Sequence, residues 1–122
     1  GLSYTTFGYS DLSISPREQT PDGSIEIKCT VTNTGKRTGD EVVQLYINDV
    51  VSSVTTYTKV LRGFERISLK PGESRDVTFT LTPQDLGLWD SEMRFTVEPG
   101  LFEVFVGASS TDIRLTSSFK IQ

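Results

Sequence analysis

Two segments of the chain alternate strictly between apolar and polar residues, and this pattern restricts the fold more than any other feature. Residues 24–32 place Ile25, Ile27, Cys29 and Val31 on one side and Glu26, Lys28, Thr30 and Thr32 on the other. Residues 76–82 repeat the pattern, with Val77, Phe79 and Leu81 opposite three threonines. A period of two residues is that of a β-strand with one buried face and one face in water. We therefore predict two half-buried strands, whose sheet exposes Glu26, Lys28, Thr30, Thr78 and Thr80.

The composition favours strands over helices throughout the chain. Its 122 residues include one Ala (Ala108) against 16 Thr, 11 Val and 7 Ile. β-Branched side chains suit a pleated sheet, whereas a chain so poor in Ala gives helices little support. The 10 Gly and 5 Pro divide the chain at short, fairly even intervals. Short strands separated by regular turns are typical of an all-β sandwich.

The remaining segments add further strands to these two. Strands are predicted at residues 7–15, 24–32, 41–48, 59–69, 76–82, 94–98, 101–106 and 114–121. A turn over residues 33–39 offers Gly35 and Gly39 for positive φ, and Pro71 with Gly72 indicates a type II turn. Residues 83–86 are predicted as one helical turn with Thr82 as its N-cap. About seven or eight strands predict an all-β, two-sheet antiparallel sandwich of fibronectin type III or immunoglobulin-like type. We expect a single domain over residues 1–122.

Charge and residue content exclude several classes of function. The net charge is −4, so a dedicated nucleic-acid-binding protein is not expected. The absence of His excludes Ser-His-Asp and Cys-His nucleophile systems and every His-based metal site. A single Cys excludes an internal disulfide and a cysteine zinc site. No apolar run approaches the roughly 18 residues of a membrane span, and no phosphate-binding or calcium-loop motif occurs. We expect no metal, no cofactor, no nucleic acid and no membrane partner.

Carboxylates and the single cysteine are the remaining candidates for chemistry. Two carboxylates can hydrolyse a glycoside when they lie on either side of the scissile bond. Asp90 with Glu92, and Asp40 with Glu41, lie close enough in sequence to be considered, but both pairs fit solvated turns better. Cys29 is in phase with the apolar face of its strand, so we expect a buried, unreactive thiol. The sequence therefore predicts no catalytic residue.

Exposed aromatic residues would allow a different function, because sugar-binding modules stack pyranose rings on Trp and Tyr. Trp89 lies where the chain crosses between two strands, and it fits a plug of the open end of the sandwich better than a sugar platform. Tyr57 lies in a polar loop over residues 49–58, with Tyr46 upstream. This loop could contact a glycan or a neighbouring domain.

A series of motifs occurs in order along the chain. They are GLSYTTF (residues 1–7), NTG (33–35), GDEVVQLY (39–46), LRGFER (61–66), LKPGES (69–74), TLTPQDL (80–86), WD (89–90), EPG (98–100) and VGASS (106–110). Together they closely resemble the fibronectin type III-like domain at the C-terminal end of glycoside hydrolase family three enzymes, the β-glucosidases and β-xylosidases. The resemblance covers essentially the whole chain.

The resemblance implies a non-catalytic accessory domain of a retaining β-glycosidase that hydrolyses terminal non-reducing β-D-glycosyl residues. In that family the nucleophilic Asp lies on a β/α barrel and the acid/base, usually a Glu, on a following α/β sandwich, so no catalytic residue carries over to this chain. The implied partners are the catalytic domains of the parent chain and, as a further suggestion, an oligo- or polysaccharide substrate. Residues 1–7 resemble the lead-in from the catalytic part. The resemblance favours a secreted or periplasmic parent enzyme over a cytoplasmic one.

The strands over residues 41–48 and 101–106 are apolar on both faces. Their core side is predicted to hold Val43, Leu45, Ile47, Phe102, Val104 and Val106, which leaves Val42, Tyr46, Leu101 and Phe105 on the outer face. In an immunoglobulin-like topology these strands are neighbours. We therefore expect a shared outer patch that docks on the catalytic domains. Two alternatives remain open: a cover formed by the chain's own loop over residues 49–58, and a free-standing carbohydrate-binding or adhesion module.

Overall fold

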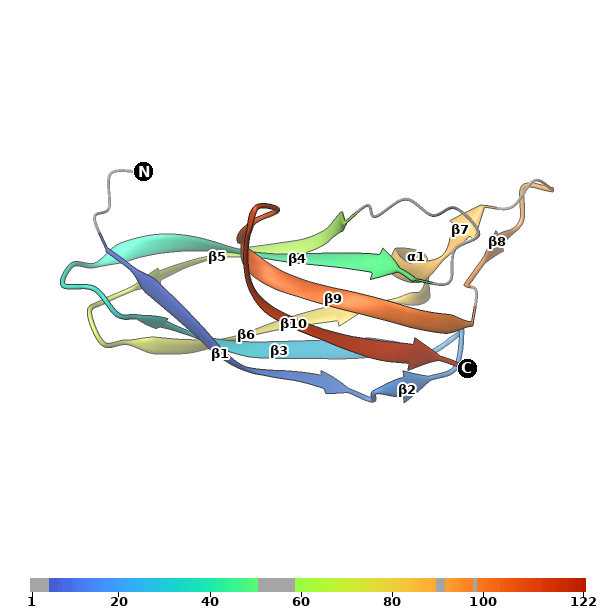
Figure 1. Cartoon of the computed structure of the whole chain (residues 1–122), viewed down its shortest axis with the longest axis horizontal. Coiled ribbons are helices and arrows are strands. Elements are labelled where there is room, and N and C mark those ends of the chain that lie inside the picture. Colours follow the sequence, from blue (N-terminus) through green and yellow to red (C-terminus); the bar gives the residue numbers. More distant parts are fainter. Residues whose placement is uncertain (1–4, 51–58, 90–91, 98) are drawn as a thin grey trace.

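The computed structural model describes residues 5–50, 59–89, 92–97 and 99–122, and these residues fold into two packed β-sheets (Figure 1). The smaller sheet has the strand order β1 (Phe7–Ser15), β3 (Ile25–Asn33), β6 (Ser74–Leu81). The larger sheet has the order β2 (Glu18–Gln19), β10 (Asp112–Ile121), β9 (Gly100–Ser109), β4 (Gly39–Asp49), β5 (Val60–Leu69). The two sheets lie face to face as the layers of a sandwich, which confirms the predicted all-β fold.

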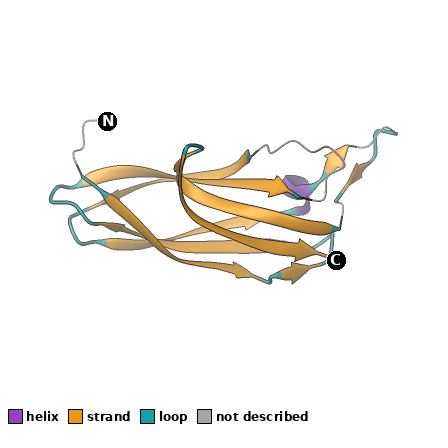
Figure 2. Cartoon of the chain, in the orientation of Figure 1, coloured by secondary structure: helices purple, strands orange, loops and turns teal. Residues whose placement is uncertain are grey.

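Three short elements complete the described part of the chain: α1 (Pro83–Leu86), β7 (Leu88–Trp89) and β8 (Phe95–Thr96). Figure 2 shows how little of the molecule is helical. β7 and β8 pair as a hairpin that projects from one end of the sandwich (Figure 1). Paired strands are antiparallel throughout the described residues, apart from β2, which runs parallel to the end of β10.

The predicted strands agree with the structure in position but differ in extent. In the described residues, the seven strands β1, β3, β4, β5, β6, β9 and β10 each have eight or more residues. The strand expected over residues 94–98 is reduced to β8, and β2 and β7 are not foreseen because two residues carry no periodicity. β9 continues past residue 106, where the register of its pairing with β10 shifts. A Cβ at Gly107 would lie 2.1 Å from the carbonyl oxygen of Asp112, so glycine permits this close approach.

Strand β3 forms the centre of the smaller sheet, and its burial alternates as the sequence predicts. Ile27 lies opposite Ile14 of β1 on one side and opposite Phe79 of β6 on the other. The outward-pointing residues Glu26, Lys28, Thr78 and Thr80 are exposed, and Thr30 is half-buried. The Thr30 hydroxyl donates a hydrogen bond to the Asp76 carboxylate at 2.9 Å, which accounts for its partial burial.

Both sheets contribute large apolar side chains to one continuous core. The largest fully buried ones are Ile25, Ile27, Val31, Val77 and Leu81 from the smaller sheet, and Val43, Leu45, Leu69, Phe102, Val104, Phe119 and Ile121 from the larger. The rings of Phe102 and Phe119 stack across β9 and β10 with their centroids 5.3 Å apart. Each Å² of apolar surface removed from water contributes about 25 cal/mol, so this core is the main source of stability.

The glycines of the two predicted turns serve different purposes. Gly72 has a φ of +78° and Glu73 donates its amide to the carbonyl of Lys70 at 2.9 Å, which confirms the type II turn. The expectation of positive φ at Gly35 and Gly39 is wrong, because neither adopts it. At Gly35 the requirement is space: a Cβ would lie 2.0 Å from the hydroxyl oxygen of Thr5.

The single helical turn begins where the sequence predicts. Thr82 is the N-cap of α1, and Pro83 occupies the first turn, where its missing amide costs no hydrogen bond. The backbone amide of Thr82 donates to the Asp85 carboxylate at 2.8 Å. At the other end, the amide of Gly87 donates to the carbonyl of Pro83 at 2.9 Å.

Cys29 is buried in the core, as its phase on β3 predicts. It lies opposite Val77 of β6. Burial raises the pKa of the Cys29 thiol to about 11, from an ordinary value of 9.0. The thiolate is the reactive form, so both burial and the raised pKa make this cysteine unreactive in the folded protein.

We predict that a thiol reagent labels Cys29 only when the protein unfolds. Cys29→Ser places a hydroxyl in an apolar site and should lower the free energy of unfolding by about 1–3 kcal/mol at neutral pH. Because the folded-state pKa of Cys29 lies above its unfolded-state value, its contribution to wild-type stability is retained below pH 9 and declines as the pH rises toward 11. The variant lacks this contribution and keeps only the decline above pH 10 that the raised pKa of Tyr9 causes, so the two proteins differ most in slope between pH 9 and 10. Urea titrations across this pH range test the prediction, and rapid labelling of the native protein would contradict it.

Candidate interdomain surface

The outer face of the larger sheet carries the four residues predicted to contact another domain. On β4, Val43, Leu45 and Ile47 point into the core, so the even-numbered residues from Val42 to Asn48 point outward. On β9, Leu101, Glu103 and Phe105 alternate with the buried residues Phe102, Val104 and Val106. The two strands are neighbours, with Tyr46 directly opposite Phe105. Val42, Tyr46, Leu101 and Phe105 therefore share one face, as predicted.

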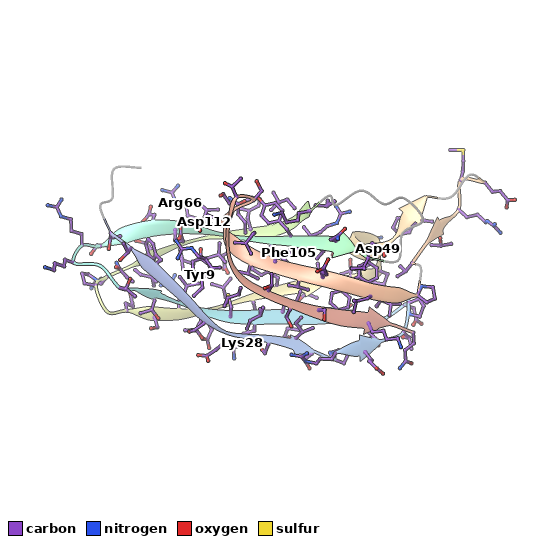
Figure 3. All side chains as sticks on the ribbon, viewed as in Figure 1. Tyr9, Lys28, Asp49, Arg66, Phe105 and Asp112 are labelled. Atoms are coloured by element: carbon purple, nitrogen blue, oxygen red, sulfur yellow. The ribbon has the colours of Figure 1, made fainter. Side chains whose placement is uncertain are left out.

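These four side chains differ in how much of them reaches water. Leu101 is 41% exposed and Val42 is similarly accessible, whereas Phe105 is half-buried and Tyr46 is only 8% exposed. The Tyr46 hydroxyl donates a hydrogen bond to the side-chain oxygen of Gln44, two residues earlier on the same face. Phe105 is labelled in Figure 3. The Lys59 ammonium lies 5.5 Å from the centroid of its ring, within the range of a cation–π interaction. The chain's own side chains thus cover the middle of the face in part.

A β-bulge in β5 adds two apolar residues to this face. Leu45 of β4 lies opposite Gly63, but the next residue, Tyr46, lies opposite Leu61, so Arg62 is an extra residue in β5. Phe64 lies opposite Gln44, which points outward. The bulge therefore brings Leu61 and Phe64 to the same face although they are three positions apart. Leu61 is 45% exposed and Phe64 69%.

Sequence analysis does not identify this extension of the surface. Simple alternation places Leu61 and Phe64 on opposite faces, because their separation is odd. The available signal is Gly63, since an isolated glycine inside a strand often marks a bulge. Leu61, Tyr46 and Phe105 form a continuous apolar row across β5, β4 and β9, and Phe64 lies beside it. We call this set, together with Val42 and Leu101, the outer apolar patch.

Polar pairs border the outer apolar patch. Arg66 Nη2 lies 2.7 Å from Asp40 Oδ2, and this hydrogen bond, with a second from Ser68, holds the pKa of Asp40 below its ordinary value. Between Phe105 and Leu101, Asn48 donates from Nδ2 to Glu103 Oε1 at 3.1 Å. The Arg66–Asp40 ion pair is exposed and contributes little to stability, so it limits the patch rather than holding the fold together.

The side chain of Asn33 organises the end of the sandwich where the first described residues lie. Asn33 is fully buried at the end of β3. Its Nδ2 donates to the carbonyl oxygens of Arg37 and Leu69 at 2.7 and 2.9 Å. Its Oδ1 accepts from the Thr5 hydroxyl at 2.7 Å and from the Gly35 amide at 3.0 Å. One side-chain amide thus joins the segment before β1, the β3–β4 turn and the end of β5.

Residues next to Asn33 hold the same segment in place. The amide of Thr34 donates to the carbonyl of Thr6 at 2.9 Å, and the two threonine hydroxyls lie 2.8 Å apart. From β10, Arg114 Nη1 donates to the carbonyl of Phe7 at 2.9 Å. Residues 5–7, part of the predicted lead-in, are therefore fixed on the body of the domain. The signal for Asn33 is its phase, since it continues the buried set of β3.

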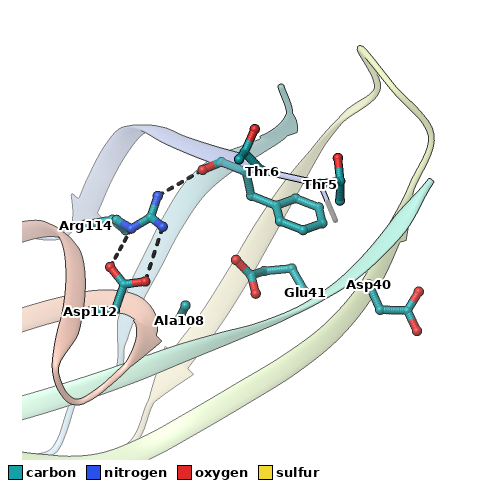
Figure 4. A pocket seen from close by; sticks show the side chains of 8 residues that line it. Thr5, Thr6, Asp40, Glu41, Ala108, Asp112 and Arg114 are labelled. Atoms are coloured by element: carbon teal, nitrogen blue, oxygen red, sulfur yellow. Dashed lines mark hydrogen bonds and ion pairs between the residues drawn. The ribbon is translucent and has the colours of Figure 1, made fainter. Parts of the chain in front are cut away.

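A polar pocket of about 460 Å³ adjoins these residues (Figure 4). It is lined by Thr5, Thr6, Phe7, Asp40, Glu41, Ala108, Asp112 and Arg114. Arg114 forms two hydrogen bonds with Asp112, from Nε at 2.7 Å and from Nη2 at 3.2 Å. Its guanidinium also lies 5.5 Å from the centroid of the Tyr9 ring. Arg114 of β10 therefore joins the two strands, because it contacts both Asp112 in β10 and Tyr9 in β1.

Tyr9 links the two sheets beside this pocket. Its hydroxyl donates a hydrogen bond to Glu41 Oε2 at 3.1 Å. Burial, and then the charge of Glu41, raise the pKa of Tyr9 well above its ordinary value, so the phenol stays a donor. Asp40 and Glu41 are adjacent on β4 and point to opposite sides: Asp40 pairs with Arg66 outside and Glu41 with Tyr9 inside. They cannot hold a substrate between them as a catalytic pair.

The structure describes only part of the other catalytic and sugar-binding candidates from the sequence. Glu92 forms an ion pair with Arg94 at 2.8 Å, while its proposed partner Asp90 lies outside the described residues. Tyr57 and most of the loop over 49–58 also lie outside them, as does the side chain of Trp89, whose backbone forms part of β7. Within the described ranges, no three His, Cys, Asp or Glu side chains gather as a metal site. The same residues contain no helix long and apolar enough to cross a membrane.

The fold and sequence together define the class of this domain. A model of the fibronectin type III-like domain family matches residues 41–110, which is more than half of the chain. That match includes β4, β5, β6 and β9, the strands that carry the outer apolar patch and its opposing core. The chain belongs to the fibronectin type III-like domain family.

The chain is similar to glycosidases, and it matches a small part of each of them. The chain is 44% identical over 114 residues to a periplasmic β-glucosidase of Salmonella typhimurium, covering 93% of this chain and 15% of that protein. It is 47% identical over 110 residues to a β-xylosidase of Formosa agariphila, covering 90% and 15%. The solved structure of a β-glucosidase from Erythrobacter marinus superposes with a TM-score of 0.92 at 35% identity, covering 100% of this chain and 16% of that one. The chain spans about one-sixth of the length of these relatives, which confirms the resemblance to their fibronectin type III-like domain.

We predict that Asn33→Ala lowers the free energy of unfolding by about 3 kcal/mol, because it leaves several buried backbone groups without partners. Asn48→Ala is the matched control, since it also removes an amide but breaks a hydrogen bond to Glu103 at a half-buried site. It should cost less than about 1 kcal/mol. Urea unfolding monitored by circular dichroism measures both values. Equal losses in the two variants would show that the Asn33 network contributes little.

Proposed function

We propose that this chain is the non-catalytic accessory domain of a retaining β-glycosidase, of β-glucosidase or β-xylosidase type, that acts on terminal non-reducing β-D-glycosyl residues. The observation that carries the proposal is the asymmetry of the matches, which cover 90% or more of this chain but 15% of the named glycosidases. Residues 1–122 form one domain, with residues 1–7 as its lead-in from the catalytic part. The partners are the catalytic domains of the same polypeptide.

The arrangement of carboxylates supports a structural role. Glycoside hydrolysis requires two carboxyl groups that face a common substrate. Asp40 accepts a hydrogen bond from Arg66, and Asp112 accepts one from Arg114. Glu41 accepts a hydrogen bond from the hydroxyl of Tyr9. Each of these groups therefore serves a contact within the domain.

The outer apolar patch supports docking against another domain. A dry interface needs contiguous apolar surface, whereas glycan binding needs exposed aromatic rings with polar groups around them. Val42, Leu61 and Leu101 are aliphatic and exposed, Phe64 is an exposed ring without a hydrogen-bonding group, and Tyr46 is largely covered. These properties favour a protein partner over the free-standing carbohydrate-binding or adhesion module, which would need Tyr46 accessible.

The isolated chain is expected to show no hydrolysis of aryl β-glucosides or β-xylosides, because the carboxylates of the described residues do not face a common substrate. The full-length protein encoded by the same gene should hydrolyse at least one of these substrates. Release of p-nitrophenol provides the measurement. Turnover by the isolated chain that survives repurification, and disappears on changing Asp90 or Glu92, would refute the assignment.

Docking predicts a context-dependent effect of the double variant Val42→Ser, Leu101→Ser. Both side chains are partly exposed in the domain, so the isolated chain should lose little stability, whereas the full-length protein should also lose the apolar burial that docking provides. Because only 36% of Val42 and 41% of Leu101 is exposed, that loss is roughly 0.5–1 kcal/mol per side chain. Met93→Ser is the control, because Met93 is 81% exposed but lies away from the patch, on the β7–β8 hairpin. Differential scanning calorimetry measures the unfolding temperature of each variant in the isolated and the full-length protein. Equal shifts in isolated and full-length protein would argue against docking through this face.

A further inference from the structure

We propose that the anchor of the docking surface is the bulged segment of edge strand β5, with Phe64 and Leu61 as the side chains that enter an apolar socket on the catalytic part of the same polypeptide. This inference rests on the function proposed above and goes further, because it names the contact residues and the mode of contact. Neither residue belongs to the patch expected from strand alternation.

Contacts with the rest of the domain hold the bulge in place. Arg62, the extra residue, donates from Nε to the carbonyl oxygen of Asp85 in α1 at 2.8 Å, so its side chain is held away from the outer apolar patch. Gly63 packs tightly on the core: a Cβ there would lie 2.9 Å from Cδ1 of the Phe79 ring. The residues on either side of this tight approach, Leu61 and Phe64, are the ones that reach the outer face. Bulges commonly re-aim side chains in this way.

The re-aimed side chains do not serve the domain's own core. Phe64 is the most exposed aromatic side chain in the described residues at 69%, and the aliphatic Leu61 beside it is also accessible. Without the bulge, one of the two positions would point inward and could bury its side chain. An arrangement that turns both outward gives up that burial, and it gains stability only when a partner covers them.

The mode of contact follows from the same feature. A regular edge strand invites another strand to pair with it, and a bulge disrupts that pairing. β5 is therefore suited to side-chain insertion rather than to strand addition by a second copy of the chain. An aromatic anchor in a pocket, with smaller apolar contacts around it, is the usual composition of an energetic hot spot. Leu61, Tyr46 and Phe105 supply those surrounding contacts in one row.

The occupant is identified by the chain that accompanies this domain in its relatives. The matches cover nearly all of this chain and only 15–16% of the glycosidases, so each relative contains a much longer polypeptide beyond the matched region. A segment tethered in the same molecule is present at high effective concentration. It can therefore bind the exposed patch without the large interface that a separate partner needs.

Hydroxyl-radical footprinting of the full-length native protein tests this proposal directly. Three side chains calibrate the measurement within one molecule: Phe102 is buried in the core, Met93 is 81% exposed on the hairpin, and Phe64 is the probe. We expect the oxidation rate of Phe64, relative to its rate in the unfolded chain, to fall to the level of Phe102, while Met93 remains fully reactive. Reactivity of Phe64 comparable with that of an exposed residue would overturn the proposal. Protection that disappears on dilution would also overturn it, because it would identify a second copy as the occupant.

A pair of variants in the full-length protein gives an independent readout. Phe64→Ser should lower the unfolding temperature of this domain by roughly 3 °C or more, while Met93→Ser leaves it unchanged. An equal response to the two substitutions would count against Phe64 as the anchor. Glycosidase activity is measured on the same preparation. An active enzyme with an exposed Phe64 refutes only this inference, whereas a protein without such activity refutes the proposed function.

Discussion

The buried amide of Asn33 fixes the end of the sandwich on which the remaining geometry depends. It satisfies two carbonyl groups and binds one hydroxyl and one amide, and these partners come from segments that are far apart in sequence. A buried amide with unfilled hydrogen-bonding capacity would be costly. The segment before β1, the β3–β4 turn and the end of β5 must therefore meet at one place. That requirement also explains Gly35, because no side chain fits between Asn33 and Thr5.

The two faces of the larger sheet are both apolar but have different surroundings. Its inner face packs on the smaller sheet and supplies Leu45, Phe102 and Phe119 to the core. Its outer face carries an apolar row across β5, β4 and β9, which the domain covers only in part. A sandwich of this size does not need apolar residues on both faces of its central strands. In the function proposed above, the outer row is the surface that docks on another part of a longer molecule, and the share of each glycosidase that this domain matches supports that proposal.

Local patterns in the sequence predict much of the fold. The alternation of residues 24–32 locates β3 and buries Cys29, and Pro71 with Gly72 gives the turn before β6. The neighbouring positions of β4 and β9, and the shared face of Tyr46 and Phe105, follow from topology and period together. Those inferences succeed because each depends on residues close in sequence or on a common strand order.

Features that depend on tertiary geometry are the ones that sequence reasoning misses. The bulge at Arg62 shifts the register of β5, and alternation alone cannot show on which side Leu61 lies. Gly35 is required by the approach of Thr5, 30 positions earlier in the chain, rather than by its own φ. The covering of Tyr46 likewise depends on neighbours such as Gln44. A polar residue in phase with a buried set, as Asn33 is, can be found from sequence, but its partners cannot.

A crystal structure of the full-length protein is the most direct measurement of whether this domain is a docked accessory module. Docking predicts that Leu61, Phe64 and Leu101 lie within about 4.5 Å of apolar side chains from the catalytic part and lose most of their exposure. The smaller sheet, with Lys28 and Thr78 on its outer face, should remain in solvent. A structure in which the outer face of β4, β5 and β9 stays open to water, with the domain attached through its lead-in alone, would contradict it.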